Sequence, residues 1–234
     1  MSGLRRSESL YPQGPRGVDG LRPAAGSFVT MPELKLLIFS DIHNDWKTLE
    51  RLLERDADRY IAGGDQVTWA RGLERCGEIL RKRGDRVYVL PGNHESADDV
   101  ANMCARYGLH DFHERHFAVG KWRVAGLGYS SPTPFNTPGE YSEEQIAERL
   151  ERFAELKPLA LVCHAPPYGT DLDEIKPGLH AGSTAVREFI EKHQPEYFFC
   201  GHIHEAEGRQ ICMGKTLAVN TGKRGYLLEL NESP

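Results

Sequence analysis

The segment LKLLIFSDIHN, residues 34–44, joins an apolar run to a polar cluster. Residues 36–39 are all apolar, which is typical of a strand that is covered on both faces. The run stops at Asp41 and His43, and polar groups at the end of a buried strand are costly to place. A metal ion would offset that cost, because carboxylate oxygen and imidazole nitrogen are both good ligands for Zn, Mn or Fe. The segment therefore suggests a metal site that needs more ligands from elsewhere in the chain.

The same arrangement recurs twice in the next sixty residues. Two further apolar strands run into Gly63-Gly64-Asp65 and into Pro91-Gly92-Asn93-His94-Glu95, and helical patterns separate them. The expected strands are 36–39, 58–62 and 86–90, and the expected helices are about 46–53, 73–83 and 96–107. This alternation predicts a parallel sheet with crossover helices, in which ligands bind outside the carboxyl ends of the strands.

The second half of the chain repeats the pattern with shorter strands. Apolar strands at 159–163 and 197–200 end at His164 and at Gly201-His202-Ile203-His204. The other expected elements are short strands at 110–113, 116–119 and 122–127, helices at 142–156 and 183–192, and antiparallel strands at 208–213, 216–219 and 225–230. Two segments rich in Pro and Gly, 129–141 and 165–182, are expected to be loops at the rim of the site, the first as a lid or substrate loop.

The strand ends supply enough groups for two metal ions. These groups are Asp41, His43, Asp65, Asn93, His94, His164, His202 and His204. Asp41, His43, Asp65 and one late histidine would make one site, and Asp65, Asn93 and two late histidines the other. Metals held about 3.5–4 Å apart can clamp an in-line phosphoryl displacement. The mixed nitrogen and oxygen ligands suit Mn, Fe, Zn or Ni, and His94 is left for acid or charge-stabilising work.

The order of these blocks resembles a known family. DxH at Asp41 and His43, GD at Asp65, GNHE at residues 92–95, a lone His164 and GHxH at residues 201–204 occur in the order of the calcineurin-like metallophosphoesterases. The resemblance covers about residues 34–230, and the chain looks most like the small single-domain prokaryotic type. It implies an α/β fold: a two-sheet mixed β-sandwich flanked by helices on both sides, in four layers αββα.

The resemblance also implies a role for each residue. Asp41, His43, Asp65 and His204 would hold the first metal, with Asp65 bridging. Asn93, His164 and His202 would complete the second. A metal-bridging hydroxide would attack a phosphomonoester or phosphodiester, with His94 protonating the leaving oxygen or stabilising charge. The alternatives are a nuclease or cyclic-nucleotide phosphodiesterase on the same site, a non-catalytic scaffold of this fold, and a single structural zinc site.

Two further residues are candidates for substrate binding. Arg71 lies where the protein Ser/Thr phosphatase branch has an Arg-Gly, although the second acid of that branch is missing, which argues against protein-phosphatase activity. His180 lies in a loop just before an expected helix N-terminus, a place where phosphate can bind. By contrast, His113 and His116 have H-x-x-H spacing but are expected in a solvated hairpin.

The bulk properties narrow the class of protein. The 234 residues are 39% hydrophobic, enough for a full core, and the net charge is −5. That charge disfavours a general nucleic-acid or membrane-surface binder, and the substrate is expected to be a small phosphorylated molecule. The sequence contains no apolar stretch of about 18 residues, so it predicts no membrane-spanning helix. Five cysteines without a CxxC pattern favour a reducing cytoplasm. The oligomeric state stays open, with a homodimer among the options.

Composition also suggests where the domain begins. Residues 1–30 are rich in Pro, Gly, Ser and Arg, show no apolar period and lack the hydrophobic core of a secretory signal. We interpret them as a flexible N-terminal tail, and residues 31–234 as a single metallophosphoesterase domain. Met31 is expected to be the natural start of the protein or of its domain.

Overall fold

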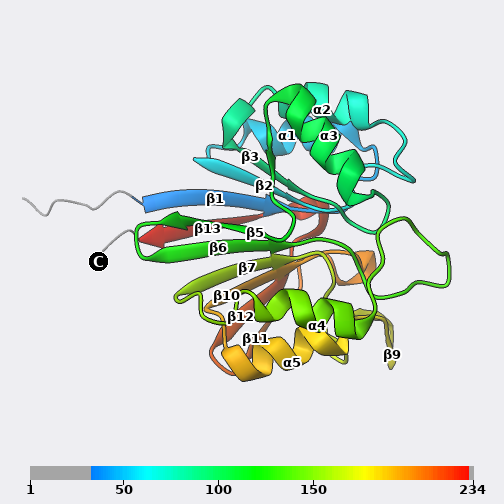
Figure 1. The fold of residues 1–234 in the computed structure, drawn as a ribbon, viewed down its shortest axis with the longest axis vertical. Coiled ribbons are helices and arrows are strands. Elements are labelled where there is room, and N and C mark those ends of the chain that lie inside the picture. Colours follow the sequence, from blue (N-terminus) through cyan, green and yellow to red (C-terminus); the bar gives the residue numbers. More distant parts are fainter. Residues whose placement is uncertain (1–32, 232–234) are drawn as a thin grey trace, which may run out of the picture. The chain divides into compact units, whose positions relative to one another are not determined.

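The structure is a computed structural model that describes residues 33–231. Two mixed β-sheets lie face to face, and helices cover the outer face of each, which confirms the predicted four layers (Figure 1). The predicted boundary between residues 30 and 31 lies outside the described residues and stays a prediction. None of the helices in residues 33–231 has the length and apolar composition that crossing a membrane requires.

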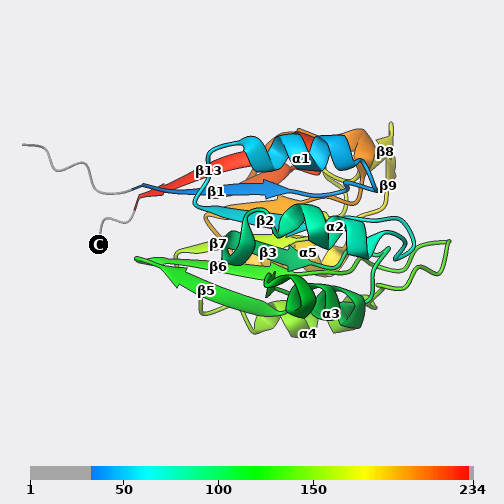
Figure 2. The ribbon, with the colours of Figure 1, turned by 90° about the horizontal axis from the view of Figure 1, so that it is seen from above.

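The first sheet contains the N-terminal strands. Its strand order is β13-β1-β2-β3-β4. Strands β1 to β3 are parallel, as predicted, β4 is also parallel to β3, and β13 is antiparallel to β1. The strands are β1 (Glu33–Phe39), β2 (Arg59–Gly63), β3 (Val87–Leu90), β4 (His110–Asp111) and β13 (Tyr226–Asn231). Helices α1 (Trp46–Glu54), α2 (Leu73–Leu80) and α3 (Ala97–Tyr107) lie over its outer face (Figure 2). Asp45 and Ser96 cap α1 and α3 through their side chains.

The second sheet is built around the later strands. Its order is β11-β12-β10-β7-β6-β5, with the four inner strands parallel and β5 and β11 antiparallel at the edges. The strands are β5 (Arg115–Val119), β6 (Trp122–Leu127), β7 (Leu159–Cys163), β10 (Tyr197–Cys200), β11 (Gln210–Met213) and β12 (Thr216–Asn220). Helices α4 (Glu143–Glu151) and α5 (Thr184–His193) cover it. Within residues 33–231 there are also single turns of 3-10 helix at η1 (Gly84–Arg86), η2 (His204–Ala206) and η3 (Gly222–Arg224).

The structure corrects three expectations from the sequence. The last three strands are not all antiparallel to their neighbours, because β12 lies parallel to β10 and antiparallel to β11. The helix expected over 142–156 ends at Glu151, and turns lead from there to Pro158. The segment 165–182 is not all loop, since it contains the hairpin of β8 (Glu174–Lys176) and β9 (Leu179–His180). Pairing partners and turn chemistry are decided between segments, so local apolar patterns could not show them.

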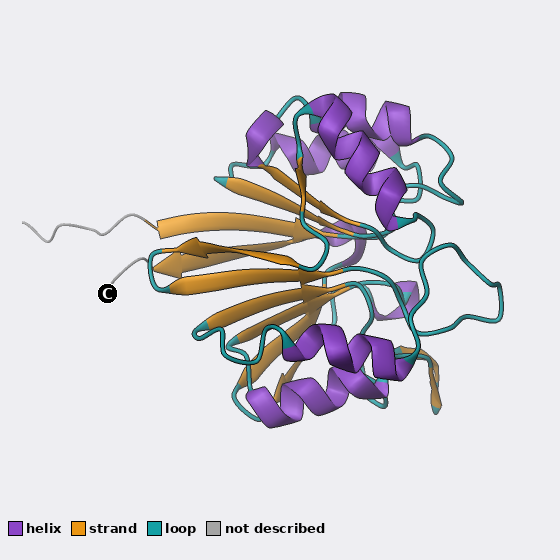
Figure 3. Cartoon of the chain, in the orientation of Figure 1, coloured by secondary structure: helices purple, strands orange, loops and turns teal. Residues whose placement is uncertain are grey.

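Strand β1 is buried on both faces, as its unbroken apolar run predicts. Leu37 and Phe39 pack against the helices, while Leu36 and Ile38 pack against the other sheet, and all four are at most 1% exposed. Each such side chain stabilises the fold by about 1.5–3 kcal/mol. Packing on both faces fixes the strand so that its carboxyl end opens at one edge of the sheet. Loops gather at that edge, on the right of Figure 3.

Candidate metal centre

All eight predicted groups follow the carboxyl ends of strands and meet at one edge of the two sheets. Asp41 and His43 follow β1, Asp65 follows β2, Asn93 and His94 follow β3, His164 follows β7, and His202 and His204 follow β10. Three overlapping groups have ligand atoms within 4.8 Å of one another: Asp41-His43-His204, His43-Asp65-His94 and Asp65-His164-His202. The first sheet and the second sheet therefore each contribute part of the cluster.

Asp65 lies between the two halves of this cluster. Its Oδ2 is 3.5 Å from His43 Nε2 and 3.4 Å from His164 Nε2, and its Oδ1 accepts the backbone N–H of His94 at 2.9 Å. Burial alone would raise the pKa of Asp65, but the facing His164 and His43 outweigh it and hold the pKa below its usual range. One carboxylate is thus in reach of ligands on both sides, the arrangement that a bridging ligand requires.

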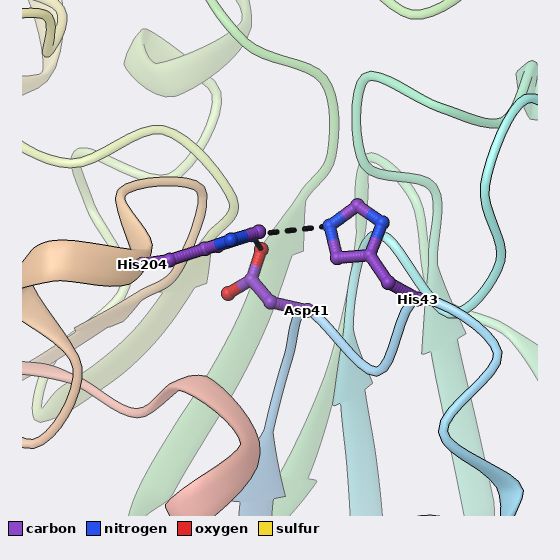
Figure 4. A group of neighbouring side chains, drawn as sticks. All are labelled: Asp41, His43 and His204. Carbon is purple, nitrogen blue, oxygen red and sulfur yellow. Dashed lines mark hydrogen bonds and ion pairs between the residues drawn. The ribbon is translucent and has the colours of Figure 1, made fainter.

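The first half of the cluster is shown in Figure 4. His43 Nε2 and His204 Nε2 face each other at 3.1 Å, and His204 Nε2 is 3.7 Å from Asp41 Oδ1. Asp41 is held in place by Ser40 Oγ, which donates to Oδ2, and by the backbone N–H of His202. Burial lowers the pKa of His43 to about 4. A neutral imidazole has a free nitrogen lone pair for a metal.

The second half brings acceptors against acceptors. The Nδ1 of buried His164 lies 2.9 Å from the Gly63 carbonyl, which only accepts, so the proton sits on Nδ1. In the neutral ring, Nε2 then points a lone pair at Asn93 Oδ1, 3.3 Å away, and at Asp65 Oδ2. His202 Nδ1 also lies 2.9 Å from Asn93 Oδ1. A cation at the centre of these atoms would satisfy them together, so the residues present fit a divalent metal.

Without a cation, a proton on His164 relieves the same conflict. Burial opposes the charged ring, but the carboxylates of Asp65 and Asp41 outweigh burial and raise the pKa of His164 to about 9. His202 behaves in the opposite way, since burial and the neighbouring His164 lower its pKa to about 4. A metal-free site would therefore carry a charged His164 at neutral pH, and metal binding would displace that proton.

A chain of hydrogen bonds sets the direction of the Asn93 amide. Glu140 Oε1 accepts the hydroxyl proton of Thr137 at 2.6 Å, so the Thr137 oxygen is free to accept. Asn93 Nδ2 donates to that oxygen at 3.2 Å, which leaves Asn93 Oδ1 facing His164 and His202. The loop 129–141 thereby takes part in positioning a candidate ligand, a role beyond the lid or substrate loop at the rim that the sequence predicts.

His94 has its own support. The backbone N–H of Trp69 donates to His94 Nδ1 at 3.3 Å, and the Ala70 N–H donates to the His94 carbonyl at 2.8 Å. Because Nδ1 accepts a hydrogen bond, the neutral ring must carry its proton on Nε2. The ring meets His43 edge-on at 4.9 Å and lines the cavity above the cluster. His94 therefore carries an N–H at Nε2 beside the candidate ligands.

The backbone at these strand ends is unusual. Four candidate ligands have positive φ: Asp41 at 56°, His43 at 46°, Asp65 at 54° and His202 at 68°. The left-handed region costs a non-glycine residue about 1–2 kcal/mol, and such strain concentrates at functional sites. Gly64 lets the chain pass this close, because a Cβ there would overlap His164 Nδ1 and its own φ is +103°.

Glu95, the last residue of the GNHE block, has a clear structural role that sequence reasoning did not assign. It is completely buried, and its two oxygens accept backbone N–H groups of Asp65, Val67 and Gly92 at 2.8–3.1 Å. Burial, with the nearby Asp65 charge, raises its pKa to about 8, and the amides oppose that rise. Glu95 ties the turn after β2 to the turn after β3, which fixes the bridging candidate relative to Asn93. The one sequence signal for this role was the position of Glu95 in the GNHE block, directly after Asn93 and His94.

Replacing Glu95 with alanine is expected to reduce the free energy of unfolding by at least about 3 kcal/mol, because three buried N–H groups lose their acceptor at about 1–3 kcal/mol each. Chemical denaturation of the metal-free chain measures this. The matched control is Glu188→Ala, an exposed position on α5, where a change below about 0.5 kcal/mol is expected. Equal free energies of unfolding for the Glu95 and Glu188 variants would contradict the structural role of Glu95 between the two turns.

Comparison with known proteins agrees with this geometry. The family described as calcineurin-like phosphoesterase matches residues 34–206. The chain belongs to this family. Uncharacterized protein MJ1162 of Methanocaldococcus jannaschii is 31% identical over 205 residues, which cover 83% of this chain and 91% of that protein.

Two solved structures share the fold of this calcineurin-like phosphoesterase. The protein TT1561 of Thermus thermophilus has a TM-score of 0.62 at 18% identity, over 86% of this chain and all of that chain. Phosphopantetheinyl Hydrolase from Mycobacterium tuberculosis has a TM-score of 0.58 at 18% identity, over 81% and 89% of the two chains. At this identity the likeness shows the fold, and the chemistry has to be argued from the site.

The remaining predicted residues lie outside the cluster. Arg71 is exposed and does not line the cavity beside the candidate ligands. His180 lies in β9 with its Nδ1 2.8 Å from Asp173 Oδ1, and it does not line that cavity either. A substrate role for both stays a prediction. The expectation of a solvated hairpin holds for His116, which is exposed on β5 of the β5–β6 hairpin. It is wrong for His113, whose side chain is only 9% exposed and whose Nδ1 accepts the Gly128 N–H.

Proposed function

We propose that this chain is a metal-dependent phosphoric ester hydrolase that acts on a small phosphomonoester or phosphodiester at a centre of two divalent ions. The observation that carries the proposal is the position of Asp65 Oδ2, which lies 3.5 Å from His43 Nε2 and 3.4 Å from His164 Nε2. A single structural site would not need one carboxylate oxygen in reach of two separate ligand groups.

The ligands divide into two sets that share Asp65. The first set is Asp41, His43, Asp65 and His204, and the second is Asp65, Asn93, His164 and His202. The chemistry supplied by such a pair of ions is activation of water and neutralisation of charge on the phosphoryl group. The donor set of imidazole and carboxylate or amide oxygen suits Mn, Fe, Zn or Ni.

The chain's own contribution to the reaction is centred on His94. Its Nε2 proton, set by the Trp69 N–H on Nδ1, is available to the leaving oxygen or to a phosphoryl oxygen. The His94 backbone N–H also donates to Asp65 Oδ1. This hydrogen bond fixes the backbone of His94 relative to Asp65, so the proton donor keeps its position beside the ligand that the two sets share.

The test is hydrolysis of p-nitrophenyl phosphate and of bis-p-nitrophenyl phosphate by the purified protein with added Mn, together with metal analysis. We expect turnover of at least one ester and about two ions per chain. The relative rates would separate a monoesterase from a diesterase, the class that includes the nuclease and cyclic-nucleotide alternatives. A protein that cleaves neither ester with Mn, Fe, Zn or Ni would contradict the proposal. One tightly held zinc per chain would instead favour a structural site.

A further inference from the structure

The cavity beside the candidate metal centre has apolar side chains in its lining as well as candidate ligands. It has a volume of about 450 Å³, within the range of about 300–1,000 Å³ that is usual for small-molecule sites. Residues of the candidate site line it together with the polar side chains of Ser131, Thr133 and Glu205. The apolar part of the lining, called the apolar wall below, comes from three segments and consists of Pro132, Pro134, Phe135, Ile175, Ala181 and Ile203.

Two of the exposed large hydrophobic side chains, Phe135 and Ile175, line this cavity. Within residues 33–231 the large hydrophobic side chains that are exposed are Trp69, Phe135, Tyr168, Ile175 and Leu179. All five lie on the segments 66–72, 129–141 and 165–182, beside the carboxyl ends of the strands. Grouped exposed apolar side chains mark binding sites more often than isolated ones do. Phe135 is 71% exposed and Ile175 36%, so both have area left to bury against a ligand.

The charged residues that line the cavity indicate which charge the organic part of a substrate can carry. Among the described residues that line it, none is Lys or Arg, whereas Asp65 and Glu205 are acidic. Beyond the metal ions, the lining offers no cation for a second phosphate or for a carboxylate on the organic part of a substrate. An anionic group placed against Phe135 and Ile175 would lose hydration without gaining a Lys or Arg partner from the lining.

The loop that carries Phe135 is held to the site. Glu140 Oε1 accepts from the Thr133 hydroxyl and from both the backbone N–H and the hydroxyl of Thr137. The Phe135 N–H donates to Thr133 Oγ1 at 3.2 Å, and Thr137 accepts from Asn93. The apolar wall is therefore positioned by the same hydrogen bonds that orient a candidate ligand.

We propose that the substrate is an ester with a single phosphoryl group whose organic part is uncharged and apolar, of about the size of an aromatic ring, and lies against Phe135 and Ile175. The inference rests on the proposed function for the position of the phosphoryl group over the metal ions. It names the class of substrate, which that function leaves open.

Binding of non-hydrolysable phosphonates to the Mn-loaded full chain, measured by calorimetry, tests the inference without catalysis. Phenylphosphonate is expected to bind at least about tenfold more tightly than methylphosphonate, from burial of the ring against the wall. 4-Carboxyphenylphosphonate, which has a ring with an added charge, is expected to lose most of that gain.

Matched variants locate the effect. Phe135→Ala and Ile175→Ala should each reduce the preference for phenylphosphonate over methylphosphonate by about threefold. Tyr168→Ala and Leu179→Ala remove exposed hydrophobic side chains that do not line the cavity, and they should leave the preference unchanged. Ile175 and Leu179 lie on the same hairpin segment, so this pair controls for hairpin stability.

The outcomes separate this inference from the proposed function. Equal affinity for the two phosphonates, or no binding of either, would overturn the inference, and hydrolysis of p-nitrophenyl phosphate by the same preparation would leave the function standing. A preference for phenylphosphonate that is lost equally in all four variants would also overturn it. A preference that follows Phe135 and Ile175 in a protein that hydrolyses no ester would support the binding site and contradict the function.

Discussion

Replacing Asp65 with asparagine is expected to release both metal ions. The amide loses the charge that attracts them, and Asp65 Oδ2 is the atom in reach of both His43 and His164. Mutation of a residue that hydrogen-bonds to a metal ligand reduces metal affinity by about 10–100-fold. Loss of a ligand that two ions share should reduce it further. Metal analysis after dialysis measures the result, with the content expected to fall from about two ions per chain to a small fraction of one.

Two controls sharpen this experiment. Asp41→Asn removes a ligand of the first set only, so the second ion should stay bound, because Asp41 is not in the group of Asp65, His164 and His202. Asp41 contacts His202 through the His202 backbone N–H, which the amide oxygen of asparagine can still accept. Asp98→Asn, at an exposed position early in α3, should change nothing. If Asp65→Asn kept both ions, or lost the same one as Asp41→Asn, the bridging assignment would be wrong.

Replacing His94 with alanine is expected to reduce turnover by about 10²–10⁴-fold, the usual contribution of a general acid or base. The two ions should stay bound, because the contact of His94 with Asp65 is through the backbone N–H, which alanine keeps. The rate with p-nitrophenyl phosphate and the metal content of the same sample measure the two effects separately.

The matched control for His94 is His116→Ala, which removes an exposed histidine of β5. It should retain full turnover. A second comparison uses esters of increasing leaving-group acidity, since a more acidic leaving group needs less protonation and should lose less rate in the His94 variant. A His94 variant with normal turnover, or one that loses its metal together with its rate, would contradict the role as proton donor.

Much of the fold was predictable because the decisive signals are local. The apolar run of β1 predicts a strand buried on both faces, and its side chains are indeed buried against helices on one face and the other sheet on the opposite face. The alternation of strands and helices predicts parallel β1 to β3, and it is confirmed. The hairpin β8–β9 and the place of β12 beside β10 were missed, because pairing within the sheet depends on distant segments.

The residues that hold the candidate ligands in place were less predictable than the ligands themselves. A turn glutamate such as Glu95, a threonine such as Thr137 and a backbone N–H such as that of Trp69 are common in loops, and nothing in their local sequence shows which group they contact. The structure shows Glu95 on three amides, Thr137 on Asn93 and Trp69 on His94. Such contacts set the direction of a side chain, which residue order does not encode by itself.

The sequence by itself determined the donor types and the edge of the sheet at which they meet. Parallel strands place their carboxyl ends on one side, so polar residues after each strand must gather there. Only the tertiary structure decided which donors face each other. Asp65 from the first sheet meets His164 from the second because the two sheets pack face to face, and left-handed φ values at Asp41, His43, Asp65 and His202 turn these residues at the strand ends. Packing between sheets and strain within turns are properties of the folded chain, so local sequence patterns do not show them.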